Sequence, residues 1–514
     1  MSQDAGVVVM MAGRPSKTEP RGKSPREGQE IGIREIPLGD LWLSVGNITE
    51  ALSYYKRALS RTADADTEVR VAVARRILEC LKRRGKLEDA LTFIDSIEPG
   101  FEMPARTWLL TEKAKVLCRI GRYGEAASIC EKVSKLGSSW ENAELYLVMG
   151  QVMARTCRWR EAITAFEHAA ATAAMHGDRG TVGKAFNNLG IAYKNLCRFD
   201  ESVRYLTKAV EIDRELRDEA SLAVKLLNLA ITRYKQGDLG ATDQAIDECL
   251  SLAEQLGMVR IARLAKICKA RLELEKGNSE CARDLVGEIV SVREEIDVRT
   301  RAIAEEVRAD IYAARGATAS AIARLKAAIG LAPGEAKDVQ AEAMSRLGAV
   351  YLQANRPKEA HVWAKRSLEV ANRIGDLYEA ARSLRTLARI LPGRQGRDAL
   401  DRAESLFRRM KARLELAITL HERARIRGIE AKMAIAYLKR AILLYRSCSA
   451  LRRRIEALCD LALAYGSLKQ FERALTCLAE AEDLSKGCAA MKARVSSART
   501  RIDRQVARSI SVRT

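Results

Sequence analysis

The clearest hydrophobic pattern in the chain predicts a pair of amphipathic helices over residues 185–212, AFNNLGIAYKNLCRFDESVRYLTKAVEI. The first helix carries Leu189, Gly190 and Tyr193 on one face, and the second carries Leu206 on the face opposite them. A small residue such as Gly190 lets two antiparallel helices approach closely, because a large side chain has no room at their nearest point. The pattern therefore predicts a tightly packed helical hairpin.

The same unit recurs along most of the chain. Residues at the place of Gly190 return at steps of 36 to 40 residues, and these markers are Gly39, Leu78, Ala114, Gly150, Gly190, Ala230, Ala270, Ala309, Gly348, Ala388, Ala424 and Ala462. A turn residue follows seven places later at Gly46, Gly85, Gly121, Gly237, Gly277, Gly316 and Asn355. Such regularity predicts about twelve stacked hairpins. Leu78 is bulky for its place, and the hairpins of Ala388 and Ala424 have irregular turns.

This unit resembles the tetratricopeptide repeat, whose usual length is about 34 residues. The longer steps here resemble those of kinesin light chains, spindle-orientation adaptors and bacterial signalling regulators. The resemblance implies an all-α fold: a right-handed superhelical α-solenoid of about twelve hairpins with a C-terminal capping helix. It also implies a non-enzymatic scaffold or regulatory adaptor that binds a partner protein or an extended peptide in a concave groove.

The predicted organisation has five parts. Residues 1–33 are rich in proline, glycine and charge, so we expect a disordered basic tail. Hairpins follow in an N-terminal part, 34–145, a central part of long units, 146–375, and a C-terminal part, 376–487. Residues 488–514 are expected to form the capping helix and a tail, with an apolar face made by Met491, Val495, Ala498, Ile502 and Val506.

Stacked hairpins place their first helices on the inner surface of the solenoid, so the residues of these helices line the groove. In the related families an asparagine two places before the small residue binds a peptide backbone, and Asn188 and Asn228 match that place. Equivalent places elsewhere hold other residues, such as Arg346, so two merely solvated asparagines are the alternative. The residues expected beside them form a basic patch suited to an acidic or carboxylate-bearing peptide: Lys184, Asn187, Lys194, Tyr234 and Lys235.

Charge is concentrated near the end of the chain. The net charge is +21, and residues 385–514 hold 29 Lys and Arg against 13 Asp and Glu, an excess of 16. Such a surface attracts an acidic protein, nucleic acid or an anionic membrane, or is simply solvated. Few aromatic residues accompany the arginines, which argues against base stacking, but a nucleic-acid-associated repeat protein is the alternative function. The densest clusters are Arg408, Arg409, Lys411, Arg413, Arg423, Arg425, Arg427, Arg452, Arg453 and Arg454.

Candidate chemistry is sparse. The four histidines have no acidic or cysteine partner at metal spacing, and no phosphate-binding loop or nucleophile motif occurs. Acid pairs such as Glu305 and Glu306 are expected on solvated helix faces. We therefore predict no enzyme activity, cofactor or metal. The twelve cysteines are scattered without a CxxC pair, which favours a reduced, cytoplasmic protein, and Cys157 and Cys197 are expected to be buried small residues. No apolar run of about 18 residues occurs, so no membrane span is expected.

Overall fold

The computed structural model of the protein describes residues 25–62, 66–135, 143–291, 296–332, 336–426, 428–486 and 489–511. Within these ranges the regular structure consists of 25 α-helices and one short 3-10 helix, and no strand is present. The predicted all-α solenoid is confirmed. The chain divides into two compact units, residues 1–139 (unit 1) and 140–514 (unit 2). The further division predicted after residue 375 stays a prediction.

Unit 1 contains three hairpins. Its helices are α1 (Pro25–Ser44), α2 (Ile48–Arg61), α3 (Thr67–Arg83), α4 (Leu87–Ile97), η1 (Glu98–Gly100), α5 (Ala105–Ile120) and α6 (Tyr123–Lys135). Helix α1 starts within the segment predicted to be a disordered tail. Proline is compatible with the first turn of a helix, where its missing N–H has no partner to lose. Residues 1–24 lie outside the described residues.

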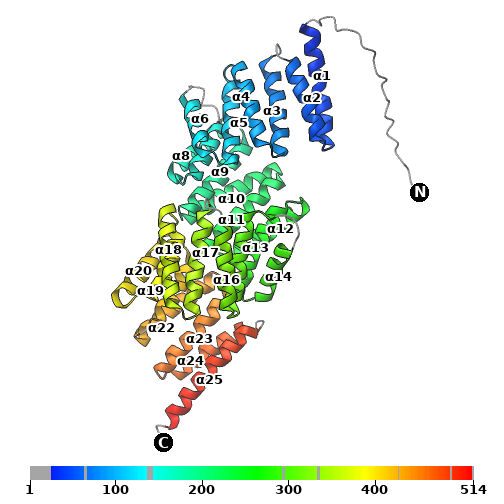
Figure 1. The fold of residues 1–514 in the computed structure, drawn as a ribbon. Helices are drawn as coiled ribbons and strands as arrows, with labels where there is room; N and C mark the ends of the chain where they lie inside the picture. The colour runs from blue at the N-terminus through cyan, green and yellow to red at the C-terminus, as the bar shows by residue number, and fades with distance from the viewer. Residues whose placement is uncertain are drawn as a thin grey trace, which may run out of the picture. The chain divides into compact units, whose positions relative to one another are not determined.

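Unit 2 contains nine hairpins and a final helix, and consecutive helices lie side by side from cyan α8 to red α25 (Figure 1). Its helices are α7 (Ala143–Arg155), α8 (Trp159–Met175), α9 (Arg179–Asn195), α10 (Phe199–Leu216), α11 (Glu219–Gln236), α12 (Leu239–Gln255), α13 (Val259–Lys276), α14 (Ser279–Ser291), α15 (Val298–Ala314), α16 (Thr318–Leu331), α17 (Lys337–Gln353), α18 (Pro357–Ile374), α19 (Leu377–Ala388), α20 (Gly393–Arg409), α21 (Arg413–Ala424), α22 (Ala431–Ser447), α23 (Leu451–Ser467), α24 (Phe471–Leu484) and α25 (Ala489–Ser511). None of these described helices is long and apolar enough to cross a bilayer.

All twelve predicted markers lie in the first helix of a hairpin. The close crossing expected at the markers is present: a Cβ atom added to Gly190 would lie only 2.4 Å from Cγ of Leu206 on the second helix. A Cβ atom added to Gly150 would lie equally close, 2.4 Å, to the ring of Phe166. These glycines are therefore required by packing rather than by backbone conformation.

The predicted turn residues adopt left-handed backbone conformations, with φ of 82° at Gly46 and 58° at Asn355. Cys157 and Cys197 occupy the same place in their hairpins, with φ of 61° and 57°. The expectation that both cysteines are buried is wrong for Cys157, which is exposed, although Cys197 is buried. The error arises because the two cysteines hold a turn position that glycine fills in most other hairpins.

The irregular hairpins of Ala388 and Ala424 have shortened first helices. Helices α19 and α21 end at these two residues, whereas α17 continues for five residues beyond its marker Gly348. Ala388 and Ala424 are consequently only partly buried.

Helix α25 packs on the last hairpin. Val495, Ala498 and Ile502 are buried in one apolar cluster with residues of α23 and α24, such as Leu461 and Leu478. The apolar face of this helix therefore covers the end of the hairpin stack, as the sequence pattern predicts.

Candidate functional site: the charged lumen of unit 2

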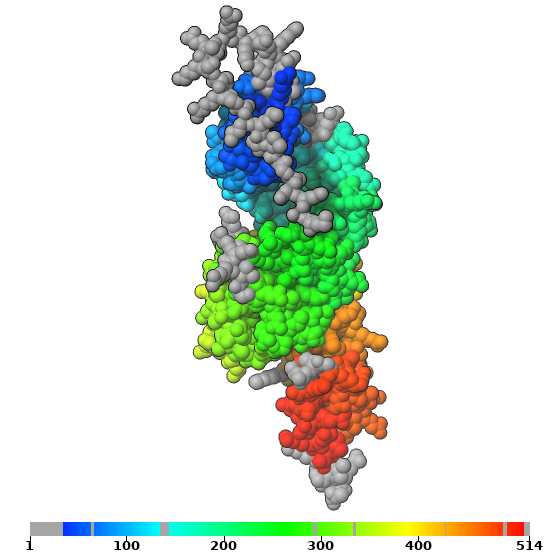
Figure 2. Space-filling model, turned by 90° about the vertical axis from the view of Figure 1, so that its right-hand side faces the viewer, coloured from blue at the N-terminus to red at the C-terminus, as the bar shows by residue number. Residues whose placement is uncertain are grey.

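In unit 2 the C-terminal hairpins contact the central hairpins, so the helices between them complete one turn of the superhelix. Arg453 on α23 donates two hydrogen bonds to Glu275 on α13, at 2.6 and 2.9 Å, although 178 residues separate them. A Cβ atom at Gly237, just after α11, would lie 2.6 Å from the backbone nitrogen of Leu414 on α21. Helices ten places apart in chain order thus meet, and the orange surface of the C-terminal hairpins lies beside the green surface of the central ones (Figure 2).

Charged side chains of the first helices line the inner surface of this turn, which we call the lumen. Arg271 on α13 contacts Glu306 on α15 at 2.9 Å and Glu342 on α17 at 3.1 Å. Arg346, on α17, contacts Glu342 at 2.8 Å and pairs with Asp310. The network therefore ties together three successive first helices.

The pKa values of the two glutamates of this network, Glu306 and Glu342, are shifted in opposite directions. Burial and the neighbouring Glu342 raise the pKa of Glu306 well above its usual range. Burial also opposes ionisation of Glu342, but Arg271 and Arg346 hold the pKa of Glu342 well below its usual range. The prediction that Glu305 and Glu306 lie on a solvated face is wrong, since their side chains are 8% and 0% exposed.

A second network lies on α19 and α21. Arg382 contacts Glu379 at 3.1 Å, Arg385 pairs with Glu415, and the Tyr378 hydroxyl donates to Glu415 at 3.2 Å. Although burial opposes its ionisation, Arg385 and Arg382 lower the pKa of Glu415 to about 2. Burial instead raises the pKa of Glu379, so the arginines favour ionisation clearly only for Glu415.

Two lysines of the lumen differ from these arginines. Among the described residues, the side chains of Lys194 on α9 and Lys235 on α11 form no ion pair or hydrogen bond. Burial and the neighbouring Lys235 lower the pKa of Lys194 to about 8. Although burial opposes its charge, Asp376, Glu342 and Glu379 raise the pKa of Lys235, whose Nζ lies 4.8 Å from the centre of the Tyr378 ring. Neither lysine therefore has a direct acidic partner, although three carboxylates act on Lys235 from a distance.

Asn188 and Asn228, which hold equivalent places in their repeats, do not contact each other through a hydrogen bond. Asn228 Nδ2 donates to Oδ1 of Asn187, not of Asn188, at 3.0 Å. The half-buried side chain of Asn188 has no hydrogen bond among the described residues, and Tyr234 is half-buried near Glu275. Lys184 is exposed and acts electrostatically on Asp178, the N-cap of α9. The structure therefore brings Lys194 together with Lys235 and Asn187 with Asn228, while Lys184 is exposed at the start of α9.

The ten residues of the predicted basic surface do not form one surface. Arg452 and Arg453 bind Glu275, and Arg454 pairs with Glu480 of its own hairpin. The others with acidic partners are Arg408 (Glu404), Lys411 (Asp200), Arg413 (Asp238), Arg423 (Asp401 and Glu404) and Arg425 (Asp460). Arg409 is exposed without a partner among the described residues, and Arg427 lies outside them. Most of this charge is thus engaged within the chain.

Family models identify the repeats. Two models described as tetratricopeptide repeat match residues 183–216 and 455–488, and residues 340–374. These ranges lie on the hairpins α9/α10, α23/α24 and α17/α18. The chain therefore contains tetratricopeptide repeats (TPRs) at these three places.

One curated relative of this chain is Protein KINESIN LIGHT CHAIN-RELATED 1 of Arabidopsis thaliana. It is 26% identical over 189 residues, which cover 34% of this chain and 31% of the relative. Among solved structures, the APC/C heterotetramer Cut9–Hcn1 has a TM-score of 0.46 at 12% identity, with 92% of each chain covered. The apo quorum sensor NprR of B. thuringiensis has a TM-score of 0.37 at 14% identity, with 82% of this chain and 100% of NprR covered.

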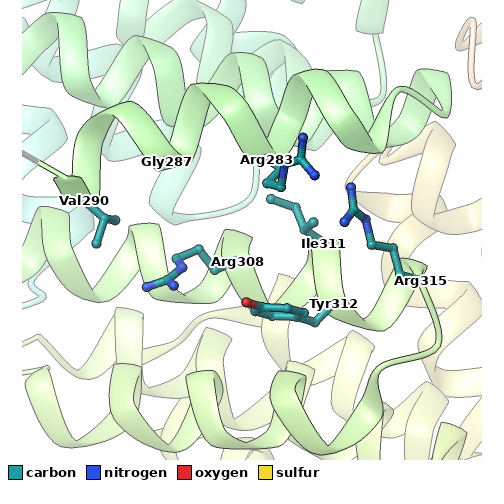
Figure 3. Close-up of a pocket in the computed structure, with 7 residues that line it drawn as sticks. All are labelled: Arg283, Gly287, Val290, Arg308, Ile311, Tyr312 and Arg315. Carbon is teal, nitrogen blue, oxygen red and sulfur yellow. The ribbon is translucent and has the colours of Figure 1, made fainter.

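A cavity of about 390 Å³ lies between α14 and α15 (Figure 3). Each of its arginines has an acidic partner: Arg308 contacts Glu305 at 2.8 Å, and Arg283 and Arg315 both pair with Glu280. The arginines of this cavity are therefore engaged within the chain, unlike Lys194. Its lining residues are Arg283, Gly287, Val290, Arg308, Ile311, Tyr312 and Arg315.

Sequence reasoning missed the acids of the lumen. Glu306 is one residue away from the groove-facing place of Val307, and Arg346 holds that place in its own repeat. An arginine at a groove-facing place, with acids at neighbouring places of adjacent repeats, is the signal that could have revealed the network.

Proposed function

We propose that this protein is an interaction scaffold, or regulatory adaptor, that holds an extended acidic segment of a partner protein in the lumen of unit 2. The observation that carries the proposal is the pair of ammonium groups on Lys194 and Lys235, which face the lumen without direct acidic partners.

The chemistry of the lumen favours an acid. The arginines of the two lumen networks are matched by carboxylates, whereas Lys194 and Lys235 repel each other. Burial and this repulsion together lower the pKa of Lys194. A carboxylate placed between them would supply the missing negative charge and form charge-assisted hydrogen bonds. An acidic side chain fits this position better than a neutral one.

The geometry favours an extended segment over a folded domain. The turn is closed by contacts between α13 and α23, so the lumen has only the width left by the side chains that line it. An extended backbone exposes N–H and C=O groups, which the amide of Asn188 can both accept from and donate to. The pair formed by Asn187 and Asn228 can bind the backbone in the same way through its remaining amide groups.

A matched set of variants tests the proposal. The probe is a fluorescent 15-residue peptide with glutamate at alternate positions, compared with its lysine counterpart by anisotropy. We expect Lys194→Met/Lys235→Met to weaken binding of the acidic peptide at least tenfold. Lys184→Met, which removes an exposed lysine of the same helix α9, should leave binding unchanged. Equal affinities for all three proteins would refute the lumen site.

Nucleic acid is a weaker candidate, because eight of the ten residues in the arginine-rich clusters have acidic partners in the chain. Binding of random duplex with a steep salt dependence would favour that function instead.

A further inference from the structure

We propose that the arginine-rich hairpins α21–α23 are an intramolecular clasp: they hold the edge of hairpins α10–α13, and their release opens the lumen to its ligand. The gating part of this inference rests on the proposed function. The clasp itself rests on contacts within unit 2.

An apolar contact forms the centre of the clasp. Leu239 and Leu272, from the central hairpins, are buried in one cluster with Leu414 and Cys448 from the C-terminal hairpins. Gly237 has φ of 88° and lets the Leu414 backbone approach closely. A side chain at this glycine would disturb both the turn and the contact.

Charged pairs flank the apolar contact on successive elements. Lys411 pairs with Asp200 on α10, and Arg413 lies 3.7 Å from Asp238, the N-cap of α12. The third pair joins Arg453 to Glu275 on α13, with Arg452 3.7 Å from the same carboxylate. In each pair the C-terminal hairpins supply the cation and the central hairpins supply the anion. The positive charge concentrated near the end of the sequence thus has a partner within the chain.

The pair formed by Lys411 and Asp200 is the part of the clasp that is most open to solvent. The Lys411 and Asp200 side chains are 68% and 41% exposed, so salt screens their attraction. The shortened first helices α19 and α21, whose markers Ala388 and Ala424 are only partly buried, lie in and beside the clasp. Hairpins that stack over fewer residues separate more easily, so we expect opening to begin at these two hairpins.

The acids of the clasp have the same chemistry as the proposed ligand. An acidic segment that reaches Arg453 competes with Glu275 for the same guanidinium group. Binding of such a segment and closure of the clasp therefore oppose each other, and the partner itself favours the open state.

Charge reversal with rescue tests the clasp without any ligand. We expect Arg453→Glu to increase hydrogen exchange in α11–α13 and α21–α23 and to raise the radius of gyration, with unchanged helical circular dichroism. The exposed Lys411→Glu should do the same more weakly. The swap Glu275→Arg/Arg453→Glu should restore slow exchange. Arg454→Glu is the matched control, since Arg454 pairs within its own hairpin with Glu480. Unchanged exchange in α13 of the Arg453→Glu protein, or an equal effect of Arg454→Glu, would overturn the clasp.

Gating has a separate readout. The acidic peptide should associate at least threefold faster with the Lys411→Glu protein than with wild type. If exchange shows opening but the association rate is unchanged, the clasp does not gate the lumen. If no protein binds the peptide, the proposed function fails while the exchange result on the clasp stands.

Discussion

The crossing at Gly190 allows a quantitative test of the repeat architecture. A Cβ atom at Gly190 would lie 2.4, 2.8 and 3.2 Å from three atoms of the fully buried Leu206 side chain. Favourable carbon contacts lie at about 3.5–4.0 Å, so α9 and α10 must move apart by about 1 Å. Overpacking of this kind costs about 1–3 kcal/mol. The higher helix propensity of alanine offsets only about 0.5–1 kcal/mol of this loss of stability.

We therefore expect Gly190→Ala to destabilise unit 2 by about 1–2 kcal/mol, and Gly190→Leu by more, in urea unfolding followed by circular dichroism. Gly287→Ala is the control, because that helical glycine has no atom near its Cβ position. It should stabilise by about 0.5–1 kcal/mol. In a Leu206→Ala background the cost of Gly190→Ala should vanish. An equal cost in both backgrounds would refute the assigned crossing.

Three further predictions concern buried charges. Lys225→Met should destabilise by about 3–5 kcal/mol in urea unfolding, because it leaves Asp213, only 3% exposed, without its cation; a cost below 1 kcal/mol would contradict this. The pKa of Glu415 is lowered from 4.5 to about 2, so its ion pair contributes fully to stability above pH 4.5, and this contribution is lost as the pH falls towards 2. The melting temperatures of wild type and Glu415→Gln should therefore differ at neutral pH and become equal near pH 2. Affinity for the acidic peptide should fall as pH rises through 8, where Lys194 loses its proton, and a flat profile between pH 7 and 9 would exclude that lysine.

The hairpins could be predicted from the sequence because their determinants are local. Gly190 and its turn residue are seven places apart, and Leu206 lies sixteen places from Gly190, so one repeat contains the whole pattern. The fold of a solenoid follows from such short-range spacing. The starts of helices, as at Pro25, are less well determined, because prolines and charges are compatible with both a tail and a first turn.

The lumen could be predicted only in part. Asn188 and Asn228 occupy equivalent places, but the hydrogen bond joins Asn228 to Asn187, since adjacent helices are offset by about one residue. The contact of Arg453 with Glu275 depends on how far each hairpin rotates relative to the last, and small rotations accumulate over five hairpins. The total rotation over these hairpins cannot be obtained from residue spacing in the sequence. Arginines that are paired inside the turn were therefore predicted to form a basic surface.

Photo-cross-linking tests the central claim most directly. The acidic 15-residue peptide, carrying a benzophenone at its middle residue, is irradiated with the full-length protein, and the cross-linked residues are located by mass spectrometry. Our account predicts cross-links on the first helices α9 and α11, close to Lys194 and Lys235, and their loss in Lys194→Met/Lys235→Met. Cross-links confined to second helices such as α20, which carries the exposed Arg409, would contradict it.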